Sequence, residues 1–330
     1  MKVNFAAEVL SDPNSWRILD HLVDYFVEQR HLWDIEDPQA IENSPWIQSD
    51  LTGRAGKANL EILQKCYTNT IYPLPTQMHS LRIQVTLTNH SPDKLTPNEA
   101  KRCLGAHAYV VVENADSDGA FLEAMIYAWQ REDSRRKKLL DAQTDGWWKI
   151  ESRGGTGEIT KCVEQIRAET VGPPRVLVLC DSDRLYPGYL KKAIQTIENY
   201  CQRQKVPYAI LQKREIENYL PLNLLQQVPR KYQQVYQAFL HLTQEQKDFY
   251  DMKFGFKRQG NSTIVLPEQQ NLFAKLLPRI LADLSGGFGE KIGQYFQTKR
   301  EHITAAAIKE ICASNPQEID NILDQIESLL

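Results

Sequence analysis

Short apolar runs that end in acidic residues are the main pattern in the middle of this chain. The run 108–112 (Ala-Tyr-Val-Val-Val) ends at Glu113, and the run 176–180 (Val-Leu-Val-Leu-Cys) ends at Asp181-Ser182-Asp183. Runs this short and rich in branched side chains predict buried parallel strands. A strand interior does not hold charge cheaply. We therefore expect both acidic groups to lie where their strands leave the core.

A third apolar run, Val206 to Leu211, leads into Glu215 and Glu217. In open α/β sheets, ligands bind beyond the carboxyl ends of the strands. Two carboxylates about 5 Å apart repel by roughly 3 kcal/mol at an effective dielectric near 20. Several converging carboxylates therefore need a cation, and Mg²⁺ and Ca²⁺ take such hard oxygen ligands. The alternative is that each acid is a separate, solvated loop end.

The pattern between these runs predicts further α/β units. A helical stretch follows Glu113 at about 120–131, and a strand is expected near 147–151. The turn 154–157 (Gly-Gly-Thr-Gly) then precedes a helix at about 158–168. Its backbone N–H groups could bind a phosphate, or it could be only the tight turn between strand and helix.

The chain on either side of these units predicts different structures. Residues 1–105 read as a mixed α/β region, with a helix whose apolar spacing runs from Trp16 to Trp33 and a half-exposed strand at 81–87. A capping box with proline, 96–99 (Thr-Pro-Asn-Glu), predicts another helix start. Residues 226–330 are mostly helical in pattern, and Pro278 should split a helix at 272–284. The apolar stripe of the last helix, after Asn315, is typical of a packing face.

The order of these motifs resembles the Toprim domain, which topoisomerases, bacterial primases and the overcoming-lysogenization-defect (OLD) nucleases share. Glu113 stands at that family's glutamate after the first strand, and Asp181-Ser182-Asp183 stands at its Asp-x-Asp. The segment 214–219 (Arg-Glu-Ile-Glu-Asn-Tyr) is similar to one that the nuclease branch adds. The resemblance covers about residues 106–222. It implies an α/β fold with a Toprim-like parallel sheet flanked by helices over 106–225.

The resemblance also implies a divalent-metal-dependent endonuclease that hydrolyses phosphodiester bonds with one or two Mg²⁺ or Mn²⁺ ions. The ligands it implies are Glu113, Asp118, Asp181, Asp183 and Glu217. Asp116 and Glu215 are alternative ligands, because Asn114 replaces the family's glycine and Ser117-Asp118 match only with an inserted residue.

Further residues are carried over by position. Lys253 joins Glu113, Asp181 and Asp183 in the expected catalytic set, although it could also be an ordinary surface lysine. Phosphate or nucleic-acid contacts are expected at Gly155, Thr156, Arg184 and Arg214.

The implied partners are a DNA or RNA substrate and a second copy of the chain in a possible homodimer. The resemblance extends to stand-alone Toprim effectors of prokaryotic antiviral systems, which pair with a separate ATPase sensor. The stretch 53–57 (Gly-Arg-Ala-Gly-Lys) has the wrong spacing for a phosphate loop, so an ATPase would be a separate subunit. Two rival hypotheses remain: a non-catalytic Toprim-fold interaction subunit, and a haloacid-dehalogenase-like phosphatase, for which Leu185 stands in place of the expected Thr or Val.

Composition adds few constraints. The chain has 330 residues, 42% of them hydrophobic and 25% charged, with a net charge of −3, so any nucleic-acid binding must rely on local basic clusters. Its six cysteines show no zinc-binding spacing, which favours a reducing, cytoplasmic location. No apolar run approaches the roughly 20 residues needed to span a bilayer.

Overall fold

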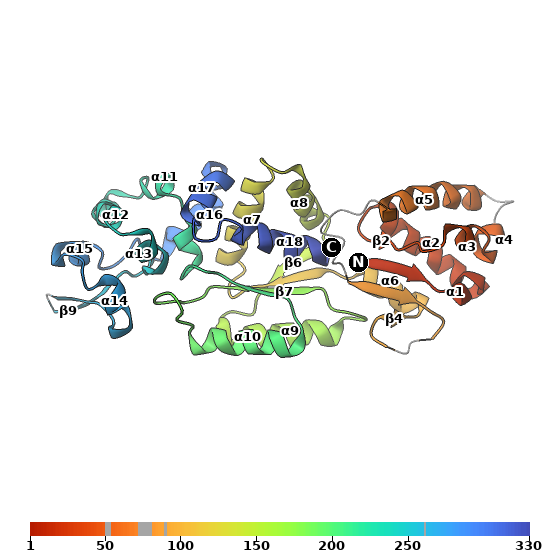
Figure 1. Ribbon diagram of the computed structural model, residues 1–330, viewed down its shortest axis with the longest axis horizontal. Coiled ribbons are helices and arrows are strands. Elements are labelled where there is room, and N and C mark those ends of the chain that lie inside the picture. Colours follow the sequence, from red (N-terminus) through yellow and green to blue (C-terminus); the bar gives the residue numbers. More distant parts are fainter. Residues whose placement is uncertain (50–53, 72–80, 89–90, 261) are drawn as a thin grey trace.

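The structure is a computed structural model that describes residues 1–49, 54–71, 81–88, 91–260 and 262–330, with the side chains at 54–60 and 135 also outside the description. Figure 1 shows an elongated molecule in which a central sheet lies between an N-terminal region and a group of short helices. Of the stretch 53–57, Gly53 lies outside the described residues and the rest begins a helix.

The N-terminal region has a small parallel sheet of its own. The strands are β1 (Lys2–Phe5), β2 (Leu32–Trp33), β3 (Arg82–Val85) and β4 (Lys94–Leu95), in the order β2-β1-β3-β4. Its helices are α1 (Ala7–Ser11), α2 (Pro13–Val27), α3 (Pro38–Glu42), α4 (Pro45–Ser49), α5 (Arg54–Ile71) and α6 (Pro97–Gly105). The capping box at Thr96 starts α6 as predicted, and the half-exposed strand predicted at 81–87 is β3.

The helix expected to reach Trp33 is shorter than predicted. Asp12 caps its start, and α2 ends at Val27. Gln29 then adopts the left-handed conformation with φ 57°, and Trp33 pairs with Val3 in β2. The prediction was wrong here because the apolar spacing continues past the helix into a buried strand.

The central sheet is parallel, which confirms the predicted α/β class. Its strands are β5 (Ala108–Val111), β6 (Trp148–Glu151), β7 (Val176–Cys180) and β8 (Tyr208–Ile210), in the order β6-β5-β7-β8. The chain leaves β5 for β6 on one side and returns to β7 on the other. This reversal makes the carboxyl ends of β5 and β7 the topological switch point, where a crevice for ligands forms in such sheets.

Helices cover both faces of this sheet (Figure 1). On one face are α9 (Ile159–Glu169) and α10 (Lys192–Gln204), and on the other are α7 (Ser117–Trp129) and α8 (Lys137–Thr144). Alternate strand residues explain the two layers, since Val110 and Leu177 join the core with α7, whereas Val111 and Val178 join the core with α9 and α10. The two central strands, β5 and β7, are thus apolar on both faces, and their acidic residues follow at the strand ends.

The chain after β8 consists of short helices and one hairpin. Its elements are η4 (Ile216–Tyr219), α11 (Leu222–Leu225), η5 (Arg230–Tyr232), α12 (Gln233–Leu240), α13 (Gln244–Phe249), β9 (Lys257–Gln259), β10 (Ser262–Ile264), η6 (Pro267–Gln269), α14 (Gln270–Phe273), α15 (Pro278–Asp283), η7 (Glu290–Gln294), α16 (Tyr295–Thr298), η8 (Arg300–His302), α17 (Ala305–Ile311) and α18 (Glu318–Leu329). Pro278 splits the helix as predicted, and the stripe of α18 is buried. The β9–β10 hairpin was not predicted. Two further short turns complete the central region: η2 (Ser134–Arg136) and η3 (Thr156–Glu158).

These helices and the sheet share one hydrophobic core. Leu177 of β7 belongs to the same cluster as Phe288 and Ile322, whereas the N-terminal region has a separate core around Trp33. Within the described residues, no helix combines the length and apolarity needed to cross a membrane. The six cysteines are all buried free thiols.

Candidate metal centre

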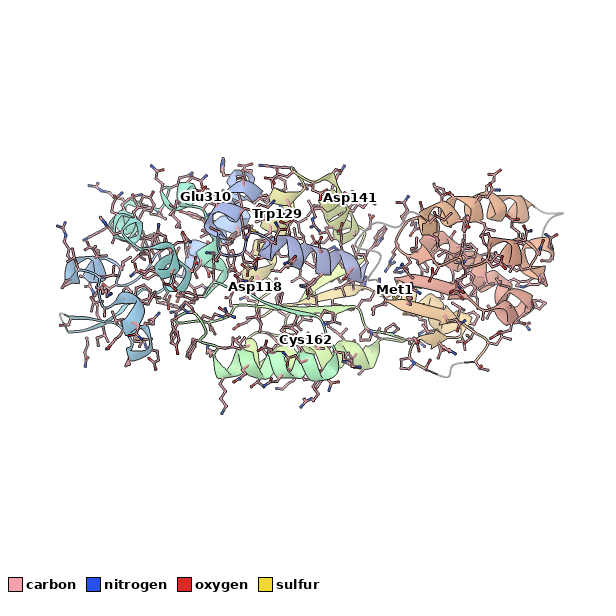
Figure 2. The ribbon with its side chains drawn as sticks, in the orientation of Figure 1. Met1, Asp118, Trp129, Asp141, Cys162 and Glu310 are labelled. Atoms are coloured by element: carbon pink, nitrogen blue, oxygen red, sulfur yellow. The ribbon has the colours of Figure 1, made fainter. Side chains whose placement is uncertain are left out.

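The acidic strand ends are brought to one edge of the sheet. Glu113 follows β5, Asp181 follows β7, and the two strands are hydrogen-bonded neighbours in which Val111 pairs with Val178. Asp118 lies in the first turn of α7, and Figure 2 shows it close to the sheet near the middle of the molecule. These positions are those expected if the acids form one site.

Asp181 is the centre of this arrangement. Its Oδ1 accepts a hydrogen bond of 2.9 Å from the backbone N–H of Ile216, which joins the Asp-x-Asp loop to the Glu-Asn-Tyr segment. Burial raises the pKa of Asp181 well above its ordinary value, and the charges of Asp118, Glu217 and Glu215 raise it further. Acids from α7 and from η4 and its cap therefore act on the carboxyl group at the end of β7.

Asp118, and not Asp116, is the buried acid of the loop after Glu113. The Asp118 side chain accepts hydrogen bonds from the backbone N–H of Asn114 at 3.0 Å and from the Ser117 hydroxyl at 3.0 Å. Asp116 is exposed at the helix start. Burial raises the pKa of Asp118, and the charge of Glu113 adds to the effect. Of the two alternatives in the sequence, the geometry therefore favours Asp118.

Lys253 lies between the two glutamates that follow β8. Its Nζ is 3.2 Å from Glu217 Oε2 and 3.7 Å from Glu215 Oε2, and its side chain is only 28% exposed. Burial opposes the charge of Lys253, but Glu217 and Glu215 outweigh that effect and raise its pKa. Burial raises the pKa of Glu215 to about 7, and burial likewise raises that of Glu217. Lys253 is therefore not an ordinary surface lysine.

The loop that carries Lys253 is braced by the segment after β8. The side-chain amide of Asn218 donates to the carbonyl oxygens of Lys247 at 2.7 Å and Tyr250 at 2.9 Å, just before Asp251. Arg214 Nη2 lies 2.7 Å from Asp251 Oδ2. The Arg-Glu-x-Glu-Asn-Tyr segment thus supplies two acids to the site and also holds the lysine loop in place.

Asp183 has a different environment from Asp181. It adopts a left-handed φ of 52°, and its backbone N–H donates to the Arg214 carbonyl at 2.9 Å. Its Oδ2 accepts a hydrogen bond of 2.6 Å from Lys191 Nζ. This hydrogen bond raises the pKa of Lys191, and the charge of Glu113 contributes as well. Lys191 therefore contacts Asp183 directly and is near enough to Glu113 for the two charges to interact.

The four residues expected at phosphates have mixed environments. The backbone N–H of Gly155 donates to the Glu113 carbonyl at 3.3 Å, so the turn that contains Gly155 and Thr156 lies beside the site. Arg214 is engaged by Asp251 and by Glu215 at 3.2 Å. Arg184 lines a separate cavity of about 590 Å³. Its other charged lining residues are Lys213, Glu245, Asp248 and Glu318.

Several contributing residues had no signal in the sequence. Asp251 was visible only as a neighbour of Lys253, and Gly293 only as a residue of a helical stretch. A Cβ added at Gly293 would lie 2.6 Å from Glu217 Oε1, so glycine is what lets η7 pack against that acid. Tertiary contacts of this kind leave no periodic pattern in the chain.

The site has the oxygen donors that a divalent ion requires, but its side chains are arranged around Lys253. The Oε2 atoms of Glu215 and Glu217 are buried and accept no hydrogen bond. Within the described part of the chain, no group of three or more His, Cys, Asp or Glu side chains is placed to hold a metal ion. The Lys253 ammonium supplies the positive charge beside these two orphaned oxygens.

Comparisons with known proteins returned no match to a family model, a curated protein or a solved structure.

Proposed function

We propose that this chain is a divalent-metal-dependent nuclease with a Toprim-like central domain. The observation that supports the proposal best is geometric: Asp181 accepts a hydrogen bond from Ile216, which lies between the buried Glu215 and Glu217, and Lys253 pairs with both glutamates. Burying several carboxyl groups together lowers the stability of the fold, and such groups are typical of functional sites. The alternative of separate solvated loop ends does not account for carboxyl groups that raise one another's pKa.

The fit of a cation can be judged from the donor atoms. Carboxylate oxygens are the ligands that Mg²⁺ and Mn²⁺ prefer, and two of them here, the Oε2 atoms of Glu215 and Glu217, are buried beside the Lys253 ammonium. Asp181, Asp118 and Glu217 would hold one ion, and Glu113 and Asp183 would complete the set, with Glu215 as the alternative ligand. A bound ion would act as a Lewis acid and would lower the pKa of its water.

The chain's own residues would position the phosphodiester. The Lys253 ammonium would face a non-bridging phosphate oxygen, which places positive charge where negative charge develops. The Gly155 N–H is already bound to the Glu113 carbonyl, so the backbone N–H of Thr156 would contact the next phosphate. Glu113 would accept a proton from the attacking water or act as a ligand.

The proposal extends to the substrate and to partners. The substrate would be DNA or RNA, and the chain would act in the cytoplasm as an effector of a prokaryotic antiviral system. It would work with a separate ATPase sensor, and it could act as a homodimer.

The test is cleavage of plasmid DNA and of tRNA with Mg²⁺ or Mn²⁺. Wild-type protein is compared with an Asp181→Asn/Asp183→Asn variant and with Asp116→Asn, which changes an exposed acid in the loop between β5 and α7. We expect divalent-dependent products from wild type and Asp116→Asn and none from the double variant. Equal products from all three proteins would refute the proposed site. Hydrolysis of p-nitrophenyl phosphate without any cut in nucleic acid would instead support a phosphatase.

One observation favours a second candidate, a non-catalytic interaction subunit. Lys253 already neutralises Glu215 and Glu217, and no metal-ready group of side chains exists in the described ranges. In that role the Toprim-like fold would bind a partner without an ion. The absence of any Mn²⁺ binding by the wild-type protein would favour this candidate over the nuclease.

A further inference from the structure

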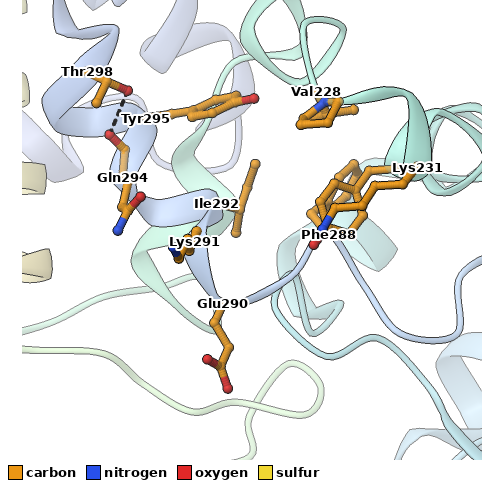
Figure 3. Close-up of a pocket in the computed structure, with 11 residues that line it drawn as sticks. Val228, Lys231, Phe288, Glu290, Lys291, Ile292, Gln294, Tyr295 and Thr298 are labelled. Carbon is orange, nitrogen blue, oxygen red and sulfur yellow. Dashed lines mark hydrogen bonds between the residues drawn. The ribbon is translucent and has the colours of Figure 1, made fainter.

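A cavity of about 420 Å³ lies beside the candidate site, between the chain at 228–232 and the chain at 288–298 (Figure 3). Figure 3 shows the Tyr295 ring and Val228 on two sides of this space, with Ile292 between them. Its volume falls within the range of ordinary small-ligand pockets. Its lining residues are Val228, Pro229, Lys231, Tyr232, Phe288, Glu290, Lys291, Ile292, Gln294, Tyr295 and Thr298.

Backbone contacts connect this cavity to the candidate metal centre. The N–H of Phe288 donates to the Met252 carbonyl at 2.8 Å, and the N–H of Gly289 donates to the Lys253 carbonyl at 3.0 Å. On the other side, Gly293 packs against Glu217. The cavity wall from Phe288 to Gln294 is therefore in direct contact with both members of the Lys253–Glu217 ion pair.

The lining combines aromatic, apolar and cationic groups. Tyr295 and Tyr232 offer two aromatic rings, each with a lysine ammonium 4.6 Å from its centroid, from Lys299 and Lys231 respectively. Lys299 is not among the lining residues, so its ammonium contacts the Tyr295 ring without filling the cavity.

The remaining polar side chains match the hydrogen-bonding edge of a heterocycle and the negative charge of a neighbouring phosphate. Lys291 and Lys231 are exposed cations at the cavity, and Gln294 offers both a donor and an acceptor. Glu290 can accept hydrogen bonds from ring or amino N–H groups. Bases that leave their stack bind in this way, on an aromatic face and through their pairing edge.

We propose that this cavity binds one unpaired base of the nucleic-acid strand whose phosphate is held at the Lys253–Glu217 pair. The inference rests on the proposed function and narrows its substrate to single-stranded or locally opened nucleic acid. A base inside a continuous duplex stack cannot enter a cavity of this kind, so extrusion is required.

Binding of fluorescently labelled oligonucleotides tests this inference, measured in EDTA so that no strand is cut. The probes are a single strand, an abasic strand with the same number of phosphates, and the fully paired duplex. The variants are Tyr295→Phe, which keeps the ring, and Tyr295→Leu and Tyr295→Ala, which remove it. Tyr127→Ala is the matched control, because the Tyr127 ring, like that of Tyr295, lies under cationic side chains but does not line the cavity. Thermal unfolding shows which variants are folded.

We expect wild type, Tyr295→Phe and Tyr127→Ala to bind the base-bearing strand at least about fivefold more tightly than the abasic strand, since one base on an aromatic side chain contributes 1–3 kcal/mol. Tyr295→Leu and Tyr295→Ala should lose this preference while binding the abasic strand equally well. Equal affinity of wild type for the two strands would overturn the inference. Free nucleoside monophosphates that bind through Tyr295 as tightly as the strand would also overturn it.

These outcomes are separate from those for cleavage. If wild type shows the Tyr295-dependent preference but cuts no substrate with Mg²⁺ or Mn²⁺, the cavity is a base site and the proposed nuclease function fails. If wild type cuts nucleic acid and Tyr295→Leu neither weakens binding nor alters cleavage, the nuclease stands and the base site is overturned.

Discussion

At the scale of single residues, the candidate site is defined by how charge is buried. Glu217 has a side chain only 1% exposed, and the nearest cation is Lys253 at 3.2 Å. A buried carboxylate without such a partner would protonate or destabilise the fold. Lys253 therefore has a structural role in the ion-free protein that is distinct from any role at a phosphate.

Replacing Lys253 with methionine should destabilise the ion-free protein at pH 8 by about 2 kcal/mol. Breaking a fully buried pair costs 3–5 kcal/mol, and the partial exposure of Lys253 reduces this figure. Urea unfolding in EDTA measures the change, with Lys253→Arg as the control that keeps the charge. The difference in unfolding free energy between wild type and Lys253→Met should be smaller at pH 5, where Glu215 is protonated. Equal unfolding midpoints for wild type and Lys253→Met at pH 8 would contradict the ion pair.

Glu215 should make stability depend on pH. Burial raises its pKa from the ordinary value of 4.5 to about 7, so the folded protein holds this proton more tightly than the unfolded chain. The stabilising contribution is complete below pH 4.5 and is lost as the pH rises through 7. Relative to Glu215→Gln, wild type in EDTA should lose on the order of 3 kcal/mol over this interval. Parallel pH profiles for the two proteins would show that Glu215 titrates normally.

At the scale of elements, two glycine turns hold the lysine loop against the cavity wall. Gly255 has φ 62°, and a Cβ there would collide with the Leu284 carbonyl and lie 2.5 Å from the Gly287 nitrogen. Gly287, in turn, approaches the Lys253 carbonyl so closely that a Cβ would be 2.5 Å away. Only residues without a side chain allow these two loops to touch.

The substitution Gly255→Ala should therefore cost more than positive φ alone. Gly154 is the matched control, because it has φ 75° but no atom within 4 Å of an added Cβ. We expect Gly154→Ala to lose about 1 kcal/mol of unfolding free energy, and Gly255→Ala to lose a further 1–3 kcal/mol from the collision. Equal losses, measured by denaturant unfolding, would mean that the two loops are not in contact.

The sequence predicted the elements that have strong local signals. The strands β5 and β7 are short apolar runs, and the helix α6 has a complete capping box at Thr96. The hairpin β9–β10 was missed because its first strand, Lys257–Gln259, is fully exposed and has no apolar alternation. The end of α2 was missed because Trp33 pairs with Val3 when β2 joins β1. This pairing outweighs the local helix propensity.

Only part of the candidate site was predictable from the sequence, because tertiary contacts set the positions of several of its residues. Residues that follow a strand directly, such as Glu113 and Asp181, can be placed at the sheet edge from the pattern alone. The choice of Asp118 over Asp116 depends on which side of α7 faces inward, and the position of Lys253 depends on a hydrogen bond from Asn218 to Tyr250. Contacts between loops that are distant in the sequence set these positions, so no single stretch of the chain predicts them.

At the scale of the whole molecule, α18 is anchored to the central region by a buried arginine. The Arg136 side chain is 2% exposed and lies 2.6 Å from Asp324, 3.2 Å from Glu327 and 3.7 Å from Asp320. These acids lie along the helix whose apolar stripe completes the core over the sheet. One guanidinium thus ties the last helix to the turn before α8.

Arg136→Met should destabilise the protein by about 2–3 kcal/mol, because it removes the buried guanidinium that pairs with Asp324 and Glu327. Arg131→Met is the control, since Arg131 is exposed, donates to the Glu301 carbonyl at 2.9 Å and lies over the Tyr127 ring. The Arg131→Met variant should lose no more than about 0.5 kcal/mol of unfolding free energy. Urea unfolding midpoints compare the two variants, and similar midpoints would contradict the anchoring role of Arg136.

The most direct test of the central claim is calorimetric titration of Mn²⁺ into wild type and into Asp181→Asn in buffers of different ionisation enthalpy. Because burial raises the pKa of Glu215 to about 7, binding of an ion beside it at pH 6.5 should release protons, and fewer should be released at pH 8. The account predicts saturable, proton-releasing binding in wild type and its loss in Asp181→Asn. Absence of binding in wild type, or identical binding in both proteins, would contradict it.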